Sequence, residues 1–304
     1  LATQVDDVVH ALHQATEQQV AVLRMLRSQP RLLVEGGAGT GKTVLAVALA
    51  REHAAQGKTV LLTCFNKALA QSLAGWLADV PGITVQPFHE LARTLATTAG
   101  LPYEVPADAQ AQSQFFSETS AELLLQATEL LSTRYDTLVV DEAADFATTW
   151  WVALEALGAP GFSWYCFYDR QQCLFQATAA WEPPFTATPM ALDTNLRNTR
   201  PIGETAARLG RCTAAPAFRL DEGPVPTVIP CAQPDQMAGQ LRTLLRDLLH
   251  RQALRPEQIA VLSPYRRDKA ASTWAAGLDA CKTTDVIAAP PPGHVRVGTV
   301  QAFK

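Results

Sequence analysis

The residues best suited to chemistry in this sequence lie at positions 36–43, which read GGAGTGKT. The segment has the spacing G-x-x-x-x-G-K-[ST], and it lies between a short apolar run and an alanine- and leucine-rich stretch of helical pattern. Glycines let the backbone bring successive N–H groups around phosphate oxygens, and the N-terminus of the following helix adds partial positive charge. Lys42 would reach the β- and γ-phosphates of a nucleoside triphosphate, and the Thr43 hydroxyl would ligate Mg²⁺. We therefore expect ATP and Mg²⁺ to be bound here, through Gly37, Ala38, Gly39, Thr40, Gly41, Lys42 and Thr43.

A second chemical group is the carboxylate pair Asp141 and Glu142, which follows the apolar residues 138–140. Asp141 is placed to hold Mg²⁺ through water, and Glu142 to orient and deprotonate the attacking water. Carboxylates that follow strands can also simply cap the next helix. The glycine-rich segment in the same chain favours the catalytic interpretation over this alternative.

The composition sets the broad class of protein. A length of 304 residues suggests roughly two domains, and 48% hydrophobic residues are enough to form substantial cores. The net charge of −4 does not indicate constitutive, charge-driven nucleic-acid binding. A local basic groove is still compatible with this net charge. The six cysteines contain no C-x-x-C pair, which favours free thiols in a reducing compartment. We find no membrane-spanning run and no signal peptide, and we expect a cytoplasmic protein, processed or a fragment because it begins at Leu1.

Alternating apolar and amphipathic segments predict an α/β fold with mostly parallel sheets. We expect strands at about 32–34, 59–65, 82–86, 138–140, 164–169, 227–231, 259–263 and 295–300. Helices are expected at about 5–26, 42–57, 66–77, 88–98, 113–132, 234–251 and 269–278. In open parallel sheets, ligands bind beyond the carboxyl ends of the strands, where Gly36, Asp141, Asp169 and Gln172 would gather. This pattern predicts a doubly wound first domain with one active edge, followed by a second α/β unit.

The ordered set of motifs resembles the two motor domains of UvrD/Rep-type superfamily-one helicases, most closely the branch often fused to a NERD nuclease domain. The resemblance covers nearly the whole chain. Residues 16–18 (TEQ) resemble the adenine-reading glutamine motif, and residues 36–43 are motif I. Residues 63–68 (TCFNKA) and 87–92 (PFHELA) resemble two segments that contact single-stranded DNA. Residues 141–145, 168–175 and 195–199 resemble motifs II, III and IV, while residues 259–265 and 298–304 resemble the second domain's core strand and the start of motif V.

The resemblance implies two RecA-like P-loop NTPase domains, at 1–196 and 197–304, the second incomplete, with a short insertion at about 102–132. It assigns adenine recognition to Gln18, γ-phosphate sensing to Gln172, and phosphate contact from the second domain to Arg197. With Lys42, Asp141 and Glu142, these last two residues form the expected catalytic set. A single strand of DNA or RNA would contact Thr63, Phe65, Asn66, Lys67 and His89. The resemblance implies an ATP-dependent DNA helicase or translocase that would act with a fused or partner nuclease in DNA repair or phage defence.

Several of these residues also have a plain structural interpretation. Phe65 could belong to the core because it ends an apolar strand, and Lys67 could be a solvated helix charge. His89 could be a capping or packing histidine, and Arg197 a surface arginine. We interpret Trp150 and Trp151 as helix packing, not as a platform for bases.

Three departures from the family pattern favour an alternative. Ala144 stands where the family usually has glutamine, and residues 176–178 replace a tryptophan-arginine pair that stacks on DNA. The sequence ends at Lys304, before the arginine of motif VI, so we expect this chain to bind nucleotide with slow or absent turnover. The alternative is a nucleotide-gated regulator or scaffold that closes on ATP to control a partner, without moving along a strand.

Overall fold

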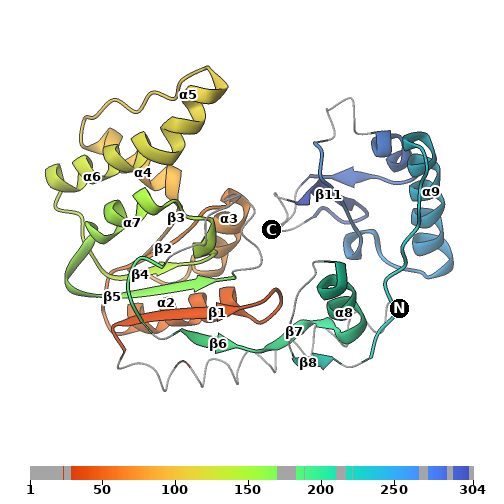
Figure 1. Ribbon diagram of the computed structural model, residues 1–304, viewed down its shortest axis with the longest axis horizontal. Helices are drawn as coiled ribbons and strands as arrows, with labels where there is room; N and C mark the ends of the chain where they lie inside the picture. The colour runs from red at the N-terminus through yellow and green to blue at the C-terminus, as the bar shows by residue number, and fades with distance from the viewer. Residues whose placement is uncertain are drawn as a thin grey trace. The chain divides into compact units, whose positions relative to one another are not determined.

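The computed structural model describes residue 23 and residues 29–169, 183–187, 189–209, 217–220, 222–266, 273–285 and 290–300 (Figure 1). These residues belong to two units, an N-terminal unit that extends to Gly223 and a C-terminal unit that begins at Pro224. The division therefore falls later than the expected boundary between residues 196 and 197. The physical reason is that strand β7 (Thr194–Thr199) hydrogen-bonds to the glycine-rich loop of the N-terminal unit.

The N-terminal unit is built on a six-stranded sheet in the order β3-β2-β4-β5-β1-β6. The strands are β1 (Arg31–Gly36), β2 (Val60–Cys64), β3 (Ile83–Pro87), β4 (Tyr135–Val140), β5 (Gly158–Tyr168) and β6 (Met190–Leu192). Every neighbouring pair is parallel, as the registers Val34 to Phe167 and Leu62 to Val139 illustrate. All five residues of β2 are buried, as expected of a strand covered on both faces. The predicted parallel α/β fold is confirmed.

Helices cover both faces of this sheet (Figure 1). One core joins the sheet to α2 (Lys42–Ala55) and α3 (Lys67–Trp76). The other joins it to α4 (Phe88–Thr98), α6 (Ser120–Leu130) and α7 (Thr148–Glu155). The region expected as one helix at 113–132 is α5 (Ala109–Gln114), the π-helical turn η1 (Phe115–Thr119) and α6. Leu124 of α6 is fully buried in the second core, so this segment is an integral part of the unit.

A buried histidine fixes α2, the helix that follows the glycine-rich loop, to the sheet. The Tyr165 hydroxyl donates to the Gln29 carbonyl (3.2 Å), so His53 Nε2 donates to the Tyr165 oxygen (3.3 Å). His53 Nδ1 is then the acceptor from the Thr137 hydroxyl (2.8 Å) and from Lys58 Nζ (3.5 Å). Burial, and second the charge of Lys58, lower the pKa of His53 to about 4, so the imidazole is neutral at physiological pH.

Three short strands of the N-terminal unit lie outside the strand ranges given above from the sequence. They are β6, β7 and β8 (Ala217–Leu220). Strand β6 extends the main sheet beside β1, while β7 and β8 pair with each other in parallel. Helix α8 (Arg200–Leu209) follows β7 directly.

The C-terminal unit contains a second, three-stranded parallel sheet in the order β10-β11-β9. Its strands are β9 (Ala260–Ser263), β10 (Thr283–Thr284) and β11 (Val295–Thr299). The helix α9 (Pro234–Arg246) continues into the π-helical turn η4 (Asp247–Arg251), close to the expected helix at 234–251. The described part of this unit also contains two 3₁₀ segments, η5 (Pro256–Gln258) and η6 (Thr273–Ala280). The segment η6 replaces the expected α-helix at 269–278 over the residues described there.

One predicted strand of the C-terminal unit is wrong. Residues 227–231 are irregular, with no strand assigned to them. Pro226 and Pro230 flank the apolar residues of this segment, and proline has no N–H to give to a sheet.

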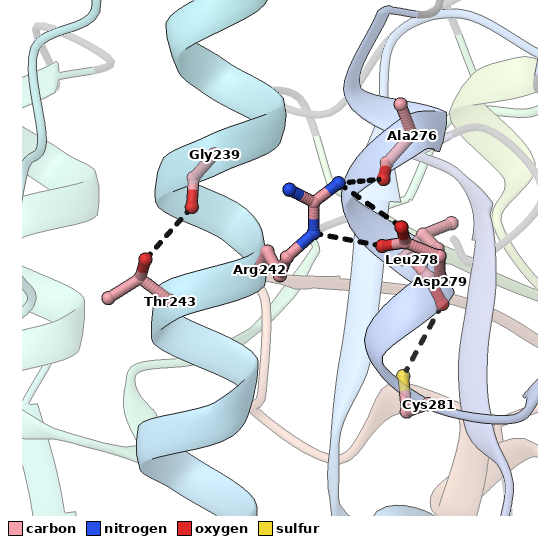
Figure 2. Close-up of polar contacts among 7 residues, drawn as sticks. All are labelled: Gly239, Arg242, Thr243, Ala276, Leu278, Asp279 and Cys281. Carbon is pink, nitrogen blue, oxygen red and sulfur yellow. Dashed lines mark hydrogen bonds and ion pairs between the residues drawn. The ribbon is translucent and has the colours of Figure 1, made fainter.

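Helix α9 is attached to η6 by an arginine and a close backbone approach (Figure 2). Arg242 donates from Nε to Asp279 Oδ1 (3.0 Å) and from Nη2 to the Ala276 carbonyl (2.9 Å). A Cβ atom on Gly277 would lie 2.6 Å from the Ala238 carbonyl oxygen, so this contact requires glycine.

Among the residues described, no helix combines the length and apolar character needed to cross a membrane. The four cysteines within that part of the chain, Cys64, Cys166, Cys231 and Cys281, are free thiols.

Candidate nucleotide-binding site

The glycine-rich segment forms a tight loop between the end of β1 and the start of α2. Gly39 and Gly41 have φ angles of 80° and 87°, a left-handed conformation that favours glycine. Gly41 is the N-cap of α2, so the loop delivers its backbone to the positive end of a 14-residue helix. The Thr40 hydroxyl donates to the Gly37 carbonyl (2.8 Å) and closes the turn. These features give the loop the shape of an anion-binding cradle.

Lys42 lies against this loop although it carries a charge. The residue is only 6% exposed, and Nζ donates to the carbonyl oxygens of Gly36 (2.9 Å) and Gly37 (3.1 Å). These bonds hold the ammonium at the loop, so an incoming phosphate would meet a positive charge that is already positioned.

Asp141 sits at the carboxyl end of β4, fully buried, with its Oδ1 accepting from the Glu142 N–H (3.0 Å). Burial, and second the neighbouring charge of Glu142, raise the pKa of Asp141 to about 6. A hydrogen bond from Thr43 and the charge of Lys42 oppose this rise in pKa. Lys42, Thr43 and Asp141, the predicted phosphate and metal residues, therefore lie in one cluster.

The second oxygen of this carboxylate fits a metal ion. Asp141 Oδ2 is buried and has no hydrogen-bond partner among the residues that the structure describes. An unpaired buried carboxylate oxygen is costly, and a cation beside the Thr43 hydroxyl would remove that cost. No group of three or more histidine, cysteine or acidic side chains gathers within the described part of the chain. A Mg²⁺ ion bound here would therefore depend on Thr43, Asp141, water and the phosphates, which is how this ion is commonly held beside nucleotides.

Glu142 has an unusual backbone conformation. Its φ and ψ angles are 53° and 43°, in the left-handed region, which is uncommon for a residue with a side chain. Such a conformation costs free energy and is found preferentially at functional sites. The conformation accords with the expected role of Glu142 as the base that activates water, a role that stays a prediction.

Two of the residues expected to contact a nucleic-acid strand pack in an aromatic cluster. The Phe65 ring is stacked on Trp150, with centroids 5.9 Å apart, and the His89 ring meets Trp150 edge-on at 4.7 Å. Burial lowers the pKa of His89 to about 4, so this side chain is neutral at physiological pH. Trp150 itself is buried, in agreement with its interpretation as helix packing.

The other strand-contact candidates differ in exposure. Asn66 is the N-cap of α3, and its Oδ1 accepts from the N–H groups of Ala68 (2.8 Å) and Leu69 (3.3 Å). Thr63 is 1% exposed and so presents no side chain to the surface, whereas Lys67 is exposed at the start of α3. Contact of these residues with a strand remains a prediction.

Arg197 was expected to approach the phosphates from a second domain. The structure places it on β7, within the same unit as the glycine-rich loop, with an exposed side chain. Gln18 and Gln172, expected to read adenine and the γ-phosphate, lie outside the described residues.

One residue at this site was not foreseen. Asn195, two positions before Arg197, is 3% exposed and donates from Nδ2 to the Ala38 carbonyl in the loop (2.9 Å). These two residues are 157 positions apart, so no local sequence signal reveals the contact. The resemblance of residues 195–199 to motif IV identified this segment as functional, but it assigned the phosphate contact to Arg197 and not to Asn195.

The comparisons with known proteins agree with this geometry. Residues 13–161 match the family described as "AAA domain", which is a family of P-loop NTPases. No curated protein matches the chain. The matched region contains the loop, Lys42, Thr43 and Asp141 on the parallel sheet described above. The N-terminal unit is therefore a nucleotide-binding P-loop NTPase domain with a RecA-like α/β fold.

Proposed function

We propose that this chain is the ATP-dependent motor of a UvrD/Rep-type DNA helicase or translocase, associated with a nuclease in DNA repair or phage defence. The observation that supports it is the common edge of the sheet. Strands β1 and β4 end at the loop and at Asp141, while β2 ends just before Phe65 and β3 ends two residues before His89. Because all of these strands are parallel, the nucleotide and the candidate strand contacts share the edge where ligands bind in such sheets.

In this proposal the chain's own residues divide the hydrolysis of ATP between them. The loop and Lys42 bind the β- and γ-phosphates, and Thr43 and Asp141 hold Mg²⁺, which supplies charge neutralisation when it is bound. Glu142 orients a water whose oxygen attacks the γ-phosphorus, and takes its proton, while the bond to the ADP oxygen breaks. Arg197 approaches the phosphates to stabilise the charge that develops.

A nucleotide-gated regulator is the second candidate function. The packing of Phe65 and His89 against Trp150 favours it, because rings held in a cluster are less free to stack on bases. The capping bond of Asn66 occupies an oxygen that a strand contact would otherwise use. In this case the loop would bind ATP without any response to nucleic acid.

The test is ATP turnover by the full-length protein, with and without single-stranded DNA, and with RNA of the same sequence. Strong stimulation by DNA supports the motor, and preference for RNA would redirect the substrate. A flat response together with tight ATP binding supports the regulator. Lys67→Glu should raise the DNA concentration needed for half-maximal stimulation, since it reverses an exposed charge at the candidate strand surface. Lys282→Glu, an exposed lysine of the C-terminal unit, is the matched control for the change in net charge.

A further inference from the structure

Asn195 joins β7 to the phosphate loop through both ends of its side-chain amide. Nδ2 donates to the Ala38 carbonyl (2.9 Å), and Oδ1 accepts from the N–H groups of Arg197 (3.1 Å) and Asn198 (2.9 Å). The next residue adds a main-chain bond, because the Leu196 N–H donates to the Gly39 carbonyl (2.9 Å). Two consecutive carbonyls of the loop are thus held by two consecutive residues of one strand.

These bonds also orient the N–H groups of the loop. A peptide unit is planar and trans, so its N–H points opposite to its C=O. Asn195 holds the Ala38 carbonyl and thereby directs the Gly39 N–H away from β7. Leu196 holds the Gly39 carbonyl and directs the Thr40 N–H in the same way. The Thr40 N–H makes a long bond, 3.4 Å, to the Gly37 carbonyl, which a phosphate oxygen could replace.

The contact is rigid as well as close. A Cβ atom on Gly39 would lie 2.4 Å from Asn195 Oδ1, so the side-chain amide packs directly on the loop backbone. The two N–H donors to Oδ1 fix the rotamer of a side chain that is 3% exposed. Aspartate would fit the space but would turn an acceptor toward the Ala38 carbonyl.

We propose that Asn195 is a positioning residue for nucleotide binding: it holds the phosphate loop in the shape in which the Gly39 and Thr40 N–H groups face a bound phosphate. This role rests on the nucleotide binding of the loop, and it requires neither hydrolysis nor a nucleic-acid partner.

The test compares Asn195→Ala and Asn195→Asp with Asn198→Asp, which makes the same charge change three residues along β7. We would titrate each protein with a fluorescent ADP in Mg²⁺ buffer at 10 °C, and compete that ligand with pyrophosphate, whose contacts are to the phosphate site alone. Circular dichroism and the melting temperature report whether each variant is folded under these conditions.

Asn195→Ala should weaken the binding of ADP and of pyrophosphate by a similar factor of about 2 to 12, the range for one net hydrogen bond. Asn195→Asp should weaken them by more than about tenfold, since the carboxylate repels both the Ala38 carbonyl and the phosphates. Asn198→Asp should bind close to wild type. A melting temperature that falls while both affinities stay at the wild-type value would overturn the proposal and leave Asn195 a purely structural residue.

If neither Asn195 variant folds, the wild-type protein still decides. The side-chain amide signals of Asn195 in a ¹⁵N–¹H spectrum should shift when ADP or pyrophosphate fills the loop, and unchanged signals at saturation would refute the role. Absence of DNA-stimulated turnover would refute the motor proposal but would not change these binding results. The motor proposal and the role of Asn195 can therefore fail separately.

Discussion

Replacing Lys42 by methionine tests the phosphate site with the least disturbance to the fold. Methionine fills a similar volume, so the apolar contacts of the lysine stem are kept. The variant loses the bonds from Nζ to the Gly36 and Gly37 carbonyls. It also removes a charge that is 6% exposed, which lowers the desolvation cost of the fold. These two effects oppose each other, and we expect the melting temperature of the free protein to change by only a few degrees.

The effect on nucleotide binding should be large. A charge-assisted hydrogen bond contributes about 1.5–3 kcal/mol, so the loss of the ammonium should weaken MgADP binding by roughly 100-fold. At a ligand concentration of 100 times the wild-type Kd, binding stabilises the wild-type protein by about 2.7 kcal/mol. For a unit of this size that is a rise in melting temperature of roughly 5–11 °C. The same concentration should stabilise the variant by about 0.4 kcal/mol, a shift of roughly 1 °C.

Thermal unfolding followed by fluorescence, with and without MgADP, measures both quantities. Lys282→Met, in the C-terminal unit, makes the same change at an exposed lysine and should keep the full ligand shift. A Lys42→Met protein that retained a shift of several degrees would show that nucleotide binds elsewhere, and the assignment of the phosphate site would be wrong.

Three further perturbations follow from the geometry of particular residues. Glu142→Gly should be about 1 kcal/mol more stable than Glu142→Ala in urea unfolding, because glycine adopts φ of 53° without strain, while both should lose ATP turnover. Since the pKa of His53 is about 4 in the fold and about 6.5 in the unfolded chain, stability should fall as pH drops from 6.5 toward 4. Wild type should lose about 1 kcal/mol more than His53→Gln between pH 7.5 and 5.5, and equal losses would contradict the buried neutral imidazole. Gly277→Ala should destabilise the C-terminal unit by about 1–3 kcal/mol through contact with Ala238, whereas Gly239→Ala, with open space around it on α9, should be neutral or stabilising in the same urea titration.

The part of the fold that the sequence predicted well depends on local patterns. Buried parallel strands are continuous apolar runs, so β2, β4 and the end of β5 stood out, and each ends at a residue of chemical interest. The loop before α2 was evident from the sequence for two reasons. Its glycines allow the backbone conformation of the loop, and Lys42 complements the negative charge of the phosphates. These elements place the phosphate and metal residues at one edge by parallel topology alone.

What the sequence did not predict depends on contacts between distant segments. Strand β6 has three residues and only pairs because β1 offers an edge, and no periodicity marks so short a segment. Residues 227–231 are apolar enough for a strand, yet the flanking prolines were the signal against one. The left-handed backbone of Glu142 and the bond from Asn195 to the loop are properties of the folded arrangement, with no counterpart in local residue preference.

The unforeseen contacts change how the phosphate site should be understood. The loop is supported from the β4 side by Asp141 near Thr43 and Lys42, and from the β7 side by Asn195 and Leu196. A bound phosphate could take over Lys42 Nζ or the Thr40 N–H from the loop carbonyls to which they now donate. The Ala38 and Gly39 carbonyls would keep their hydrogen bonds to β7. Asn195 Oδ1 also accepts from the N–H of Arg197, the residue proposed to contact the phosphates. One side-chain amide within the N-terminal unit therefore bonds both to the loop, at the Ala38 carbonyl, and to the main chain of Arg197.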